Sequence, residues 1–530
     1  MVAIELHIIG ILLGLGLVFW STHKLFRYAF GINTLLILIL IWAELQLGRY
    51  QFSIARILLL LGCPLMLLNT VLYVFLSKEN SGTSKERPFY VQLKTTKQPV
   101  HLENIRRGIS IIGSAGSGKT ESVVYGLLQH FAKHQFCGVI HDYKDFEITD
   151  MAYPLFHKAG IDFYTIAFDQ IYHRVNPIAP KYLPNEESVN EVARVLIENL
   201  LEQKESGAFG TSKFFNDAAE GLIAGLIWKL RSKYKRYCTL PHLIAVYQLL
   251  DTDSLIAFLS SNQIAKAMAS AFIGGKDSDR QTAGVKSTLA NALKKISSKQ
   301  LFMALSADEV PLNINGLEKP MVVSVVNNPK YETAYSPAIA AIIHTIAKQM
   351  SVRNENHSFL MMEEAPTIRL LNMHRIPATL RSYDICTVYV MQDKVQNDMM
   401  YGDKASRAIL SNLSYQFFGK VNDPDTAKYY ERFFEIIKRE TTSINRGNNL
   451  NFDTRITTGE REVSKNRAAI FFKLKQGEFI TYADGMDKKV QFRTPKILKT
   501  RPVPQKKYSE QDILENYERI FEEVWSIFKS

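Results

Sequence analysis

Three long apolar stretches occupy the start of the 530-residue chain. Residues 6–23, 28–43 and 57–77 contain no Asp, Glu, Lys or Arg and are rich in Leu, Ile, Val and Phe. A membrane-spanning helix needs about 20 mostly apolar residues. The third stretch meets this length, and so does the first when taken as residues 2–20; the second is short but extends through residue 45. We therefore predict a membrane anchor over residues 1–77 with two or three transmembrane helices.

Two other interpretations of these stretches fit less well. A signal peptide is disfavoured because the chain start carries Glu5 and no positive charge, and because no A-x-A-like cleavage site follows. A buried helical hairpin is disfavoured because the second and third stretches are long for one. With three transmembrane helices, two basic residues (Arg49 and Arg56) lie on one side and five on the other, namely Lys24, Arg27, Lys78, Lys85 and Arg87. This excess predicts that the rest of the chain is cytoplasmic.

Short apolar runs and helical patterns alternate beyond a polar linker and lead-in over residues 78–100. Seven runs are typical of buried strands: Ile109–Ile112, Gly138–Asp142, Phe163–Phe168, Met321–Val326, Phe359–Met362, Thr387–Met391 and Tyr415–Gly419. Because helical patterns separate most of them, we predict an α/β domain over 101–185 and 306–500 with a central, mainly parallel sheet. Three later runs are candidates for antiparallel edge strands: Ala469–Leu474, Phe479–Tyr482 and Val490–Phe492.

Residues 186–305 differ from the rest of the chain in having mostly helical patterns, which few strand signals interrupt. Apolar residues recur at helical spacing in five segments: Glu187–Gln203, Lys213–Lys233, Leu240–Leu250, Thr252–Leu259 and Gln281–Ile296. We predict an all-helical subdomain inserted into the α/β domain. Residues 501–530 are predicted to form a C-terminal helical tail.

The most specific motif is GSAGSGKT at residues 113–120, between an apolar run and a helical pattern over Glu121–Ala132. This context is the one expected of a phosphate-binding P-loop. Glycines let the backbone turn sharply and bring N–H groups to phosphate oxygens, and the helix N-terminus adds a positive dipole. Lys119 is expected to reach the β- and γ-phosphates, and the Thr120 hydroxyl to bind Mg²⁺. The candidate nucleotide-binding residues are Gly113, Ser114, Ala115, Gly116, Ser117, Gly118, Lys119, Thr120 and Glu121.

A P-loop NTPase also needs an acidic residue at the end of a neighbouring strand. Glu363 and Glu364 follow the apolar run 359–362, as expected of a parallel strand that ends at the ligand edge. Glu363 is the candidate metal ligand with Thr120, and Glu364 the group that orients or deprotonates the attacking water. An Asp-Glu pair is commoner at this place, so Glu363 is a departure. The alternative is an exposed acidic helix start before Pro366.

The ordered set of motifs resembles the coupling-protein ATPases of type IV secretion and conjugation, the TraD/TraG type, within the FtsK/HerA-like branch of P-loop motors. Besides the P-loop, four stretches carry the resemblance: Val139–Glu147, Phe214–Gly225, Arg381–Gln392 and Ser411–Ala427. The first is similar to the family's D-P-K-G-E stretch, with Asp142 and Lys144 kept and the Pro and Gly replaced. Asp384 likewise replaces the glycine of the family's R-x-Y-G segment. These changes indicate a divergent member.

The resemblance implies a RecA-like ATPase domain that uses ATP and Mg²⁺ and is anchored in the bacterial inner membrane. It implies a homo-hexameric ring with a central DNA channel, and a relaxase and type IV secretion channel proteins as partners. Gln392 would lie beside the γ-phosphate and position water. Arg381 would act on the neighbouring subunit's nucleotide, although Arg375 competes for this role.

Charge and cysteine content further restrict the classes of protein to which the chain could belong. The four cysteines lie far apart without a CxxC pair, which argues against a disulfide scaffold or a zinc module. Of the net charge of +12, about +10 belongs to the part beyond residue 80. Basic clusters at Lys229–Arg236, Lys438–Arg446 and Lys496–Lys507 could contact DNA phosphates without sequence preference, or lipid headgroups.

Three hypotheses follow. The first is a membrane-anchored ATPase that moves a DNA–relaxase complex to a secretion channel. The second keeps the ATPase but limits its cargo to protein effectors. The third is a membrane scaffold whose P-loop binds nucleotide as a regulatory ligand.

Overall fold

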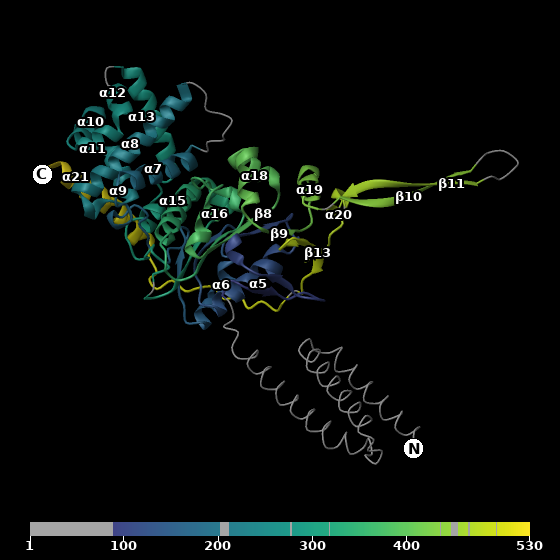
Figure 1. Cartoon of the computed structure of the whole chain (residues 1–530). Coiled ribbons are helices and arrows are strands. Elements are labelled where there is room, and N and C mark those ends of the chain that lie inside the picture. Colours follow the sequence, from purple (N-terminus) through teal and green to yellow (C-terminus); the bar gives the residue numbers. More distant parts are fainter. Residues whose placement is uncertain are drawn as a thin grey trace, which may run out of the picture. The chain divides into compact units, whose positions relative to one another are not determined.

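The computed structural model describes residues 88–201, 211–275, 278–316, 318–434, 436–446, 454–464, 467–493 and 495–529. These belong to the second of two compact units, Pro88–Ser530 (Figure 1). The predicted transmembrane helices of residues 1–77 lie outside the described residues. Within the described ranges, no helix combines the length and apolar character that crossing a bilayer requires.

A nine-stranded sheet forms the centre of this unit, in the order β13-β12-β9-β3-β8-β7-β4-β6-β5. The strands from β9 to β5 pair in parallel, and β12 and β13 continue the sheet in antiparallel orientation at one edge. Their bounds are β3 Ile109–Ile112, β4 Cys137–Asp142, β5 Asp162–Ile166, β6 Met321–Val326, β7 Ser358–Met362, β8 Ile385–Met391, β9 Tyr415–Phe418, β12 Glu478–Ala483 and β13 Met486–Gln491. The seven predicted parallel strands and the antiparallel edge are therefore confirmed.

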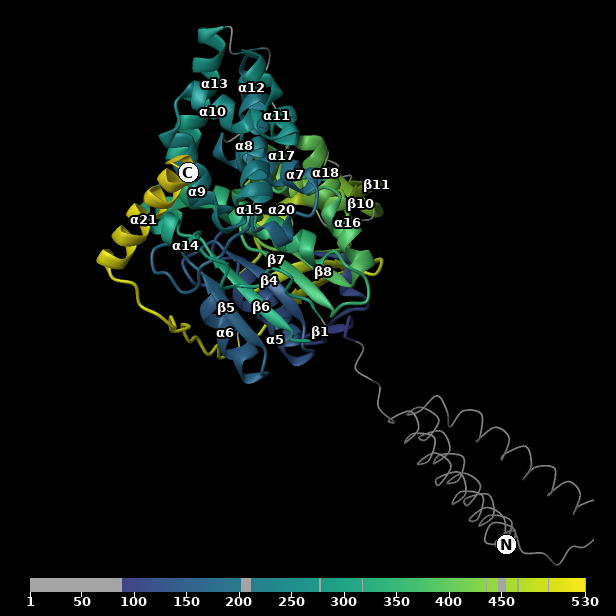
Figure 2. The same cartoon turned by 90° about the vertical axis from the view of Figure 1, so that its left-hand side faces the viewer.

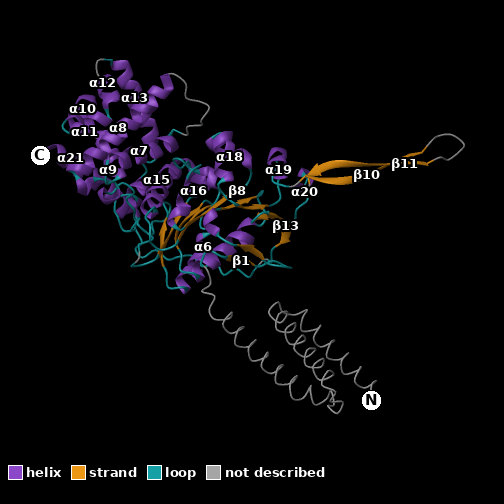
Figure 3. Cartoon of the chain, in the orientation of Figure 1, coloured by secondary structure: helices purple, strands orange, loops and turns teal. Residues whose placement is uncertain are grey.

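Both faces of the sheet are covered by helices, which explains why its central strands are apolar throughout (Figure 3). The principal helices are α5 (Tyr125–Lys133) and α6 (Thr149–Lys158) on one face and α15 (Glu332–Met350) on the other. In β7, Leu360 and Met362 belong to the core that contains α15, whereas Phe359 and Met361 belong to the core that contains α5 and α6. The Phe359 ring stacks on Phe131 of α5 at 4.4 Å.

The chain between β5 and β6 is helical, and none of its described residues lies in a strand. Its α-helices are α7 Glu186–Leu200, α8 Thr211–Lys233, α9 Leu240–Leu249, α10 Thr252–Ser260, α11 Gln263–Met268, α12 Ser270–Gly274, α13 Asp279–Lys294 and α14 Lys299–Ala304 (Figure 2). The five predicted helices are present, and the short α11, α12 and α14 are additional. The C-terminal helix α21 (Glu510–Lys529) packs against α9 and α14. The proposed division of the chain into domains remains a prediction.

Two sequence expectations at the C-terminal side were wrong. The expected strand 469–474 is the short helix α20 (Ala468–Phe472), whose Phe471 is buried against Tyr430. Five consecutive apolar residues are too few to separate helix from strand by periodicity. The hairpin of β10 (Ile436–Arg446) and β11 (Thr454–Ser464) was not predicted, because its residues are largely polar. Figure 1 shows this hairpin extending away from the sheet, beyond α19 (Pro424–Glu431) and α20.

Two glycines of α8 allow α11 to approach its backbone closely. A Cβ on Gly221 would lie 2.5 Å from the Met268 carbonyl oxygen, and one on Gly225 would lie 2.9 Å from that of Ala265. The obstacles are backbone atoms, which cannot rotate away as a side chain can. Close helix packing therefore depends on these glycines.

We predict that Gly221→Ala lowers the free energy of unfolding by about 1–3 kcal/mol, the usual cost of overpacking, despite alanine's better helix propensity. Gly274 in α12 is the matched control, because no heavy atom beyond its chain neighbours and its own helix backbone lies within 4 Å of its added Cβ. Urea unfolding of the full chain, followed by circular dichroism, checks both variants. Equal midpoints for the two would contradict the packing argument.

Candidate nucleotide-binding site

The P-loop connects β3 to the helical turn Thr120–Val124 that leads into α5. Gly116 (φ +73°) and Gly118 (φ +87°) occupy the left-handed region that glycine tolerates best. The Lys119 side chain is buried, and its Nζ donates hydrogen bonds to the carbonyls of Gly113 (2.5 Å) and Ser114 (3.4 Å). The loop thus has the compact form expected of a phosphate cradle, with the lysine ammonium folded back over it.

Neighbouring elements hold this loop from several sides. The Gly113 N–H donates to the Met391 carbonyl at the end of β8, and the Ser114 N–H donates to the Lys420 carbonyl just after β9. A turn at Gly477, before β12, also contacts the loop: its N–H donates to the Ser117 carbonyl at 2.9 Å. A Cβ on Gly118 would lie 2.9 Å from that same nitrogen. Sequence reasoning did not identify this turn as part of the site.

The two predicted carboxylates lie directly after β7, and both are buried. Glu363 Oε1 accepts a hydrogen bond from Lys144 Nζ at 3.2 Å, and its Oε2 accepts one from the Tyr143 N–H at 3.2 Å. Glu364 Oε1 accepts from Gln392 Nε2 at 3.0 Å and lies 3.0 Å from Lys144 Nζ. The structure therefore brings Glu363, Glu364 and Gln392 together, with Lys144 between the two carboxylates. An exposed acidic helix start is excluded for this pair.

The strand order explains this grouping. The sequence analysis expected the carboxylate strand beside the P-loop strand, but β8 lies between β3 and β7. Gln392 directly follows β8 and therefore lies between the P-loop and the carboxylates.

Burial lowers the pKa of Lys119, and the charges of Glu364 and Glu363 partly oppose this shift. The lysine of the P-loop and the carboxylates thus share one electrostatic environment.

A third buried carboxyl group, Asp142 at the end of β4, lies close enough to affect Glu363. Burial, and secondly the charge of Asp142, raise the pKa of Glu363 to about 8, against the effect of Lys144. Burial also raises the pKa of Asp142 to about 6, although its Oδ2 accepts hydrogen bonds from the Thr149 N–H (2.7 Å) and hydroxyl (2.5 Å). For Lys144, burial favours a lower pKa, but Glu363 and Glu364 outweigh it and raise the pKa. A single ammonium group therefore holds two carboxyl groups in a water-poor site.

Lys144 belongs to one of the stretches that carry the family resemblance, but the sequence analysis does not predict it as a site residue. It follows β4, and the next two residues, Asp145 (φ +48°) and Phe146 (φ +71°), both adopt left-handed backbone conformations. Asp145 occupies the position of the glycine in the family's stretch. The retained aspartate and lysine of a D-x-K pattern after a strand are the signal that could have identified Lys144.

Arg381 and Arg375 are not brought to this site. Arg381 begins a short 3-10 turn before β8, and Arg375 precedes the short helix α16 (Ile376–Leu380); both are exposed. The P-loop lies at the opposite, carboxyl end of β8. At about 3.3 Å per residue, the strand places Arg381 about 20 Å from the P-loop of its own chain.

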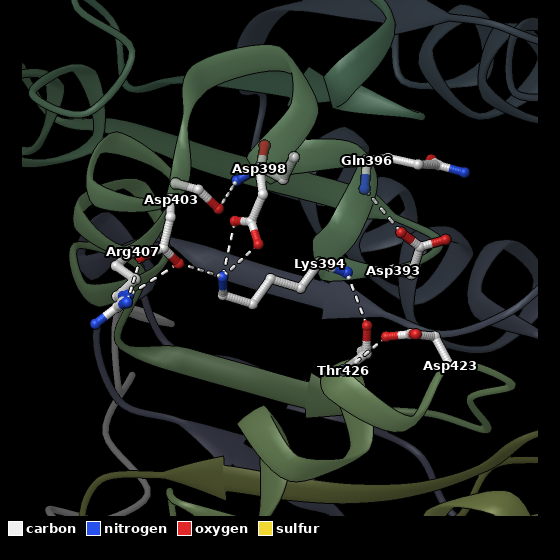
Figure 4. A network of polar contacts seen from close by, with 10 residues as sticks. Asp393, Lys394, Gln396, Asp398, Asp403, Arg407, Asp423 and Thr426 are labelled. Carbon is white, nitrogen blue, oxygen red and sulfur yellow. Dashed lines mark hydrogen bonds and ion pairs between the residues drawn. The ribbon is translucent and has the colours of Figure 1, made fainter. Parts of the chain in front are cut away.

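A polar network is centred on Lys394, two residues after Gln392 (Figure 4). Lys394 Nζ contacts both carboxylate oxygens of Asp398 (2.7 and 2.6 Å) and Asp403 Oδ1 (3.1 Å). The Lys394 N–H donates to the Thr426 hydroxyl at 3.1 Å, and the Thr426 N–H donates to Asp423 at 2.6 Å. The segment with the D-x-x-T-A pattern therefore packs against the chain that carries Gln392.

Comparisons with known proteins identify the family of the chain and similar folds. A family model described as the type IV secretion-system coupling protein DNA-binding domain matches residues 92–471. No curated protein matches the sequence.

The fold is similar to solved structures of a bacterial conjugative coupling protein. TrwBdeltaN70 in an unbound form has a TM-score of 0.61 and 14% identity, over 78% of this chain and 90% of that chain. Plasmid coupling protein TrwB with the ATP analogue ADPNP has a TM-score of 0.59 and 14% identity, over 78% and 91%. TrwB with ADP and Mg²⁺ has a TM-score of 0.60 and 13% identity, over 78% and 91%.

Proposed function

This chain belongs to the family of type IV secretion-system coupling proteins, and from that premise we propose its function. It is an ATPase that couples a DNA–relaxase complex to a type IV secretion channel and drives conjugative DNA transfer. The observation that carries this proposal is the grouping of Lys119, Glu363, Glu364 and Gln392 at one edge of the sheet. Such a constellation is needed to hydrolyse a nucleotide and not merely to bind it.

ATP is the substrate of the P-loop. The N–H groups of residues 113–118 and the start of the following helix receive its phosphates, and Lys119 turns from the Gly113 carbonyl toward the β- and γ-phosphates. The structures of TrwB with ADPNP and with ADP and Mg²⁺ support this assignment.

Thr120 and Glu363 are the residues that would hold Mg²⁺. Mg²⁺ usually takes one or two protein oxygens and completes its shell with phosphate and water, and Thr120 and Glu363 would supply two such oxygens. When bound, the ion neutralises charge on the β- and γ-phosphate oxygens.

Glu364 is the group that orients the attacking water and accepts its proton. Its position is fixed from two sides, by Gln392 Nε2 and Lys144 Nζ. Gln392 itself positions the water and follows a strand that also contacts the P-loop through Met391. The carboxyl end of β8 therefore helps to position both the attacking water and the phosphates.

The active assembly is a homo-hexameric ring, in which Arg381 of one subunit faces the nucleotide of the next. Two points support this assignment: Arg381 is exposed, and the length of β8 separates it by about 20 Å from the P-loop of its own chain. A cation aimed at the transferred phosphoryl group accelerates hydrolysis strongly. Arg375 is also exposed and is the other candidate for this role.

Residues 1–77 anchor the protein in the bacterial inner membrane, with the ATPase domain on the cytoplasmic side. The excess positive charge beyond residue 80 serves DNA binding without sequence preference. Within the cluster 229–236, Arg231 is used internally, donating to the Pro184 carbonyl at 2.7 Å, whereas Lys233, Lys235 and Arg236 are exposed. These exposed residues are the candidate phosphate contacts of that cluster.

The rate of ATP hydrolysis by the purified full chain in detergent, measured with and without DNA, tests whether DNA is the cargo. We expect DNA to stimulate the rate at about 50 mM salt and the stimulation to be largely lost at about 200 mM, because phosphate contacts release counterions. A substantial rate that DNA does not change would favour a coupling protein for protein effectors only. Absence of turnover with Mg-ATP, alone and with DNA, would favour a nucleotide-regulated scaffold.

A further inference from the structure

The turn that carries Lys144 has an unfavourable backbone. Asp145 and Phe146 both have positive φ, at +48° and +71°, and the left-handed region is rare for a bulky residue such as phenylalanine. Lys144 immediately precedes them and joins Glu363 to Glu364. The position of its ammonium group therefore depends on how well the neighbouring structure holds the turn.

Phe146 is held between an aromatic ring and a guanidinium group. It is buried in a small apolar cluster with Ala167, Tyr172 and Val326. Its ring centroid lies 5.3 Å from that of Tyr172, and the Arg501 guanidinium lies 4.3 Å from it. This distance is within the range of a cation–π contact.

Arg501 also binds Asp150, the residue at the other end of the hydrogen-bonded turn that begins at Phe146. Its Nε and Nη2 donate to Asp150 Oδ1 (3.2 Å) and Oδ2 (3.1 Å), a two-pronged contact that fixes orientation. The preceding residue adds a backbone bond, from the Thr500 N–H to the Asp150 carbonyl at 2.8 Å. Because the Asp150 N–H donates to the Phe146 carbonyl at 2.9 Å, Arg501 contacts both ends of one hydrogen-bonded turn.

The segment that bears Arg501 connects two parts of the fold. Residues 495–509, here called the strap, run past the start of α6 and lead into α21 (Figure 2). Helix α21 packs on the helices between β5 and β6: Tyr517 contacts Phe302 of α14 at 4.8 Å, and Glu523 bonds His242 of α9 at 2.9 Å. The strap therefore ties the Lys144 turn to the helical part of the chain.

We propose that Arg501 is a positioning residue for the carboxylate pair. By holding Phe146 and Asp150, it keeps the turn left-handed and so keeps Lys144 Nζ between Glu363 and Glu364. The kinetic part of this inference rests on the proposed ATPase function. Arg501 itself touches no reacting atom, and the basic cluster 496–507 thus contains one arginine with an internal role.

The test compares Arg501→Gln with Lys499→Gln in the full chain in detergent. Both substitutions remove one positive charge from an exposed residue of the strap, but Arg501 is the one that bonds Asp150 and lies over the Phe146 ring. We expect Arg501→Gln to lower kcat for ATP about tenfold with KM within about twofold, the pattern of a misplaced catalytic group. Lys499→Gln should keep the wild-type kcat.

A second substitution separates positioning from a general loss of structure. Glycine favours positive φ and alanine does not. Asp145→Gly in the Arg501→Gln background should therefore restore kcat to within about twofold of wild type, and Asp145→Ala should not. Equal kcat for Arg501→Gln and Lys499→Gln, or failure of the glycine to restore activity, would overturn the proposal.

Hydrogen exchange supplies a readout that does not depend on hydrolysis. Amides of residues 143–150 should exchange faster in Arg501→Gln than in Lys499→Gln, and the added Asp145→Gly should slow them again. If the wild type fails to hydrolyse ATP but the exchange pattern is as expected, the proposed function is wrong and the holding role of Arg501 stands. Unchanged exchange in Arg501→Gln would overturn that role even in an active enzyme.

Discussion

Replacing Lys119 by alanine is expected to abolish ATP hydrolysis and DNA transfer. The Lys119 ammonium is buried at the P-loop and shares its electrostatic environment with Glu363 and Glu364. Its Nζ donates to the Gly113 and Ser114 carbonyls of this loop. We expect kcat/KM for ATP to fall at least about 100-fold, because the charge that develops on the phosphates loses its nearest protein cation. Hydrolysis is measured on the full chain in detergent, and DNA transfer in a mating assay.

The controls for this variant separate chemistry from assembly. Lys158→Ala removes an exposed lysine at the end of α6 and should leave both activities unchanged. Membrane fractionation should recover Lys119→Ala with the membranes in wild-type amount, because the predicted anchor is remote in sequence from the P-loop. Unchanged DNA transfer by Lys119→Ala would contradict the motor function outright.

The sheet and the P-loop could be predicted from the sequence because both have strong local signals. Parallel strands that are buried on both faces are continuous apolar runs, and the predicted bounds of β3 and β6 coincide with those observed. The P-loop combines fixed glycine spacing with a preceding strand and a following helix. Glu363 and Glu364 were found for a related reason, because two charges directly after a buried strand must lie at the sheet edge.

The rest of the site depends on strand order, which the sequence does not state. That β8 lies between β3 and β7, and so brings Gln392 to Glu364, follows from packing of the whole sheet. The turn at Gly477 contacts the P-loop across more than 350 residues of intervening chain, and only the antiparallel edge places it there. Polar strands such as β10 and β11 lack the apolar alternation on which sequence reasoning relies.

The residues with left-handed backbone conformations show a third limit of prediction from the sequence. Asp145 stands where the resembling family has glycine, which sequence comparison records only as a departure. The structure shows that the backbone conformation suited to glycine is retained and that Phe146, Asp150 and Arg501 hold it. The loss of the motif's glycine is thus balanced by contacts from a segment more than 350 residues away in sequence.

Glu364→Gln is expected to stop hydrolysis while leaving ATP binding nearly intact. The amide keeps the shape of the carboxylate and can still accept a hydrogen bond from Gln392 Nε2, but it cannot take a proton from water. Loss of a positioned general base typically lowers kcat by about 10²–10⁴-fold. The KM for ATP should stay within about threefold of wild type, because Glu364 is assigned no contact with the phosphates. Steady-state hydrolysis and equilibrium binding of a fluorescent ATP analogue measure the two quantities.

Two further substitutions make this assignment specific. Glu518→Gln, on the exposed side of α21, makes the same chemical change away from the site and should have no effect. Glu363→Gln should instead raise the Mg²⁺ concentration needed for half-maximal rate, because Glu363 is assigned to the metal. If Glu364→Gln shifts the Mg²⁺ requirement and Glu363→Gln does not, the two roles are exchanged. That outcome has a physical basis, because Lys144 holds both carboxylates at nearly equal distances, 3.2 and 3.0 Å. Their other neighbours differ: Glu363 accepts from the Tyr143 N–H and Glu364 from Gln392 Nε2.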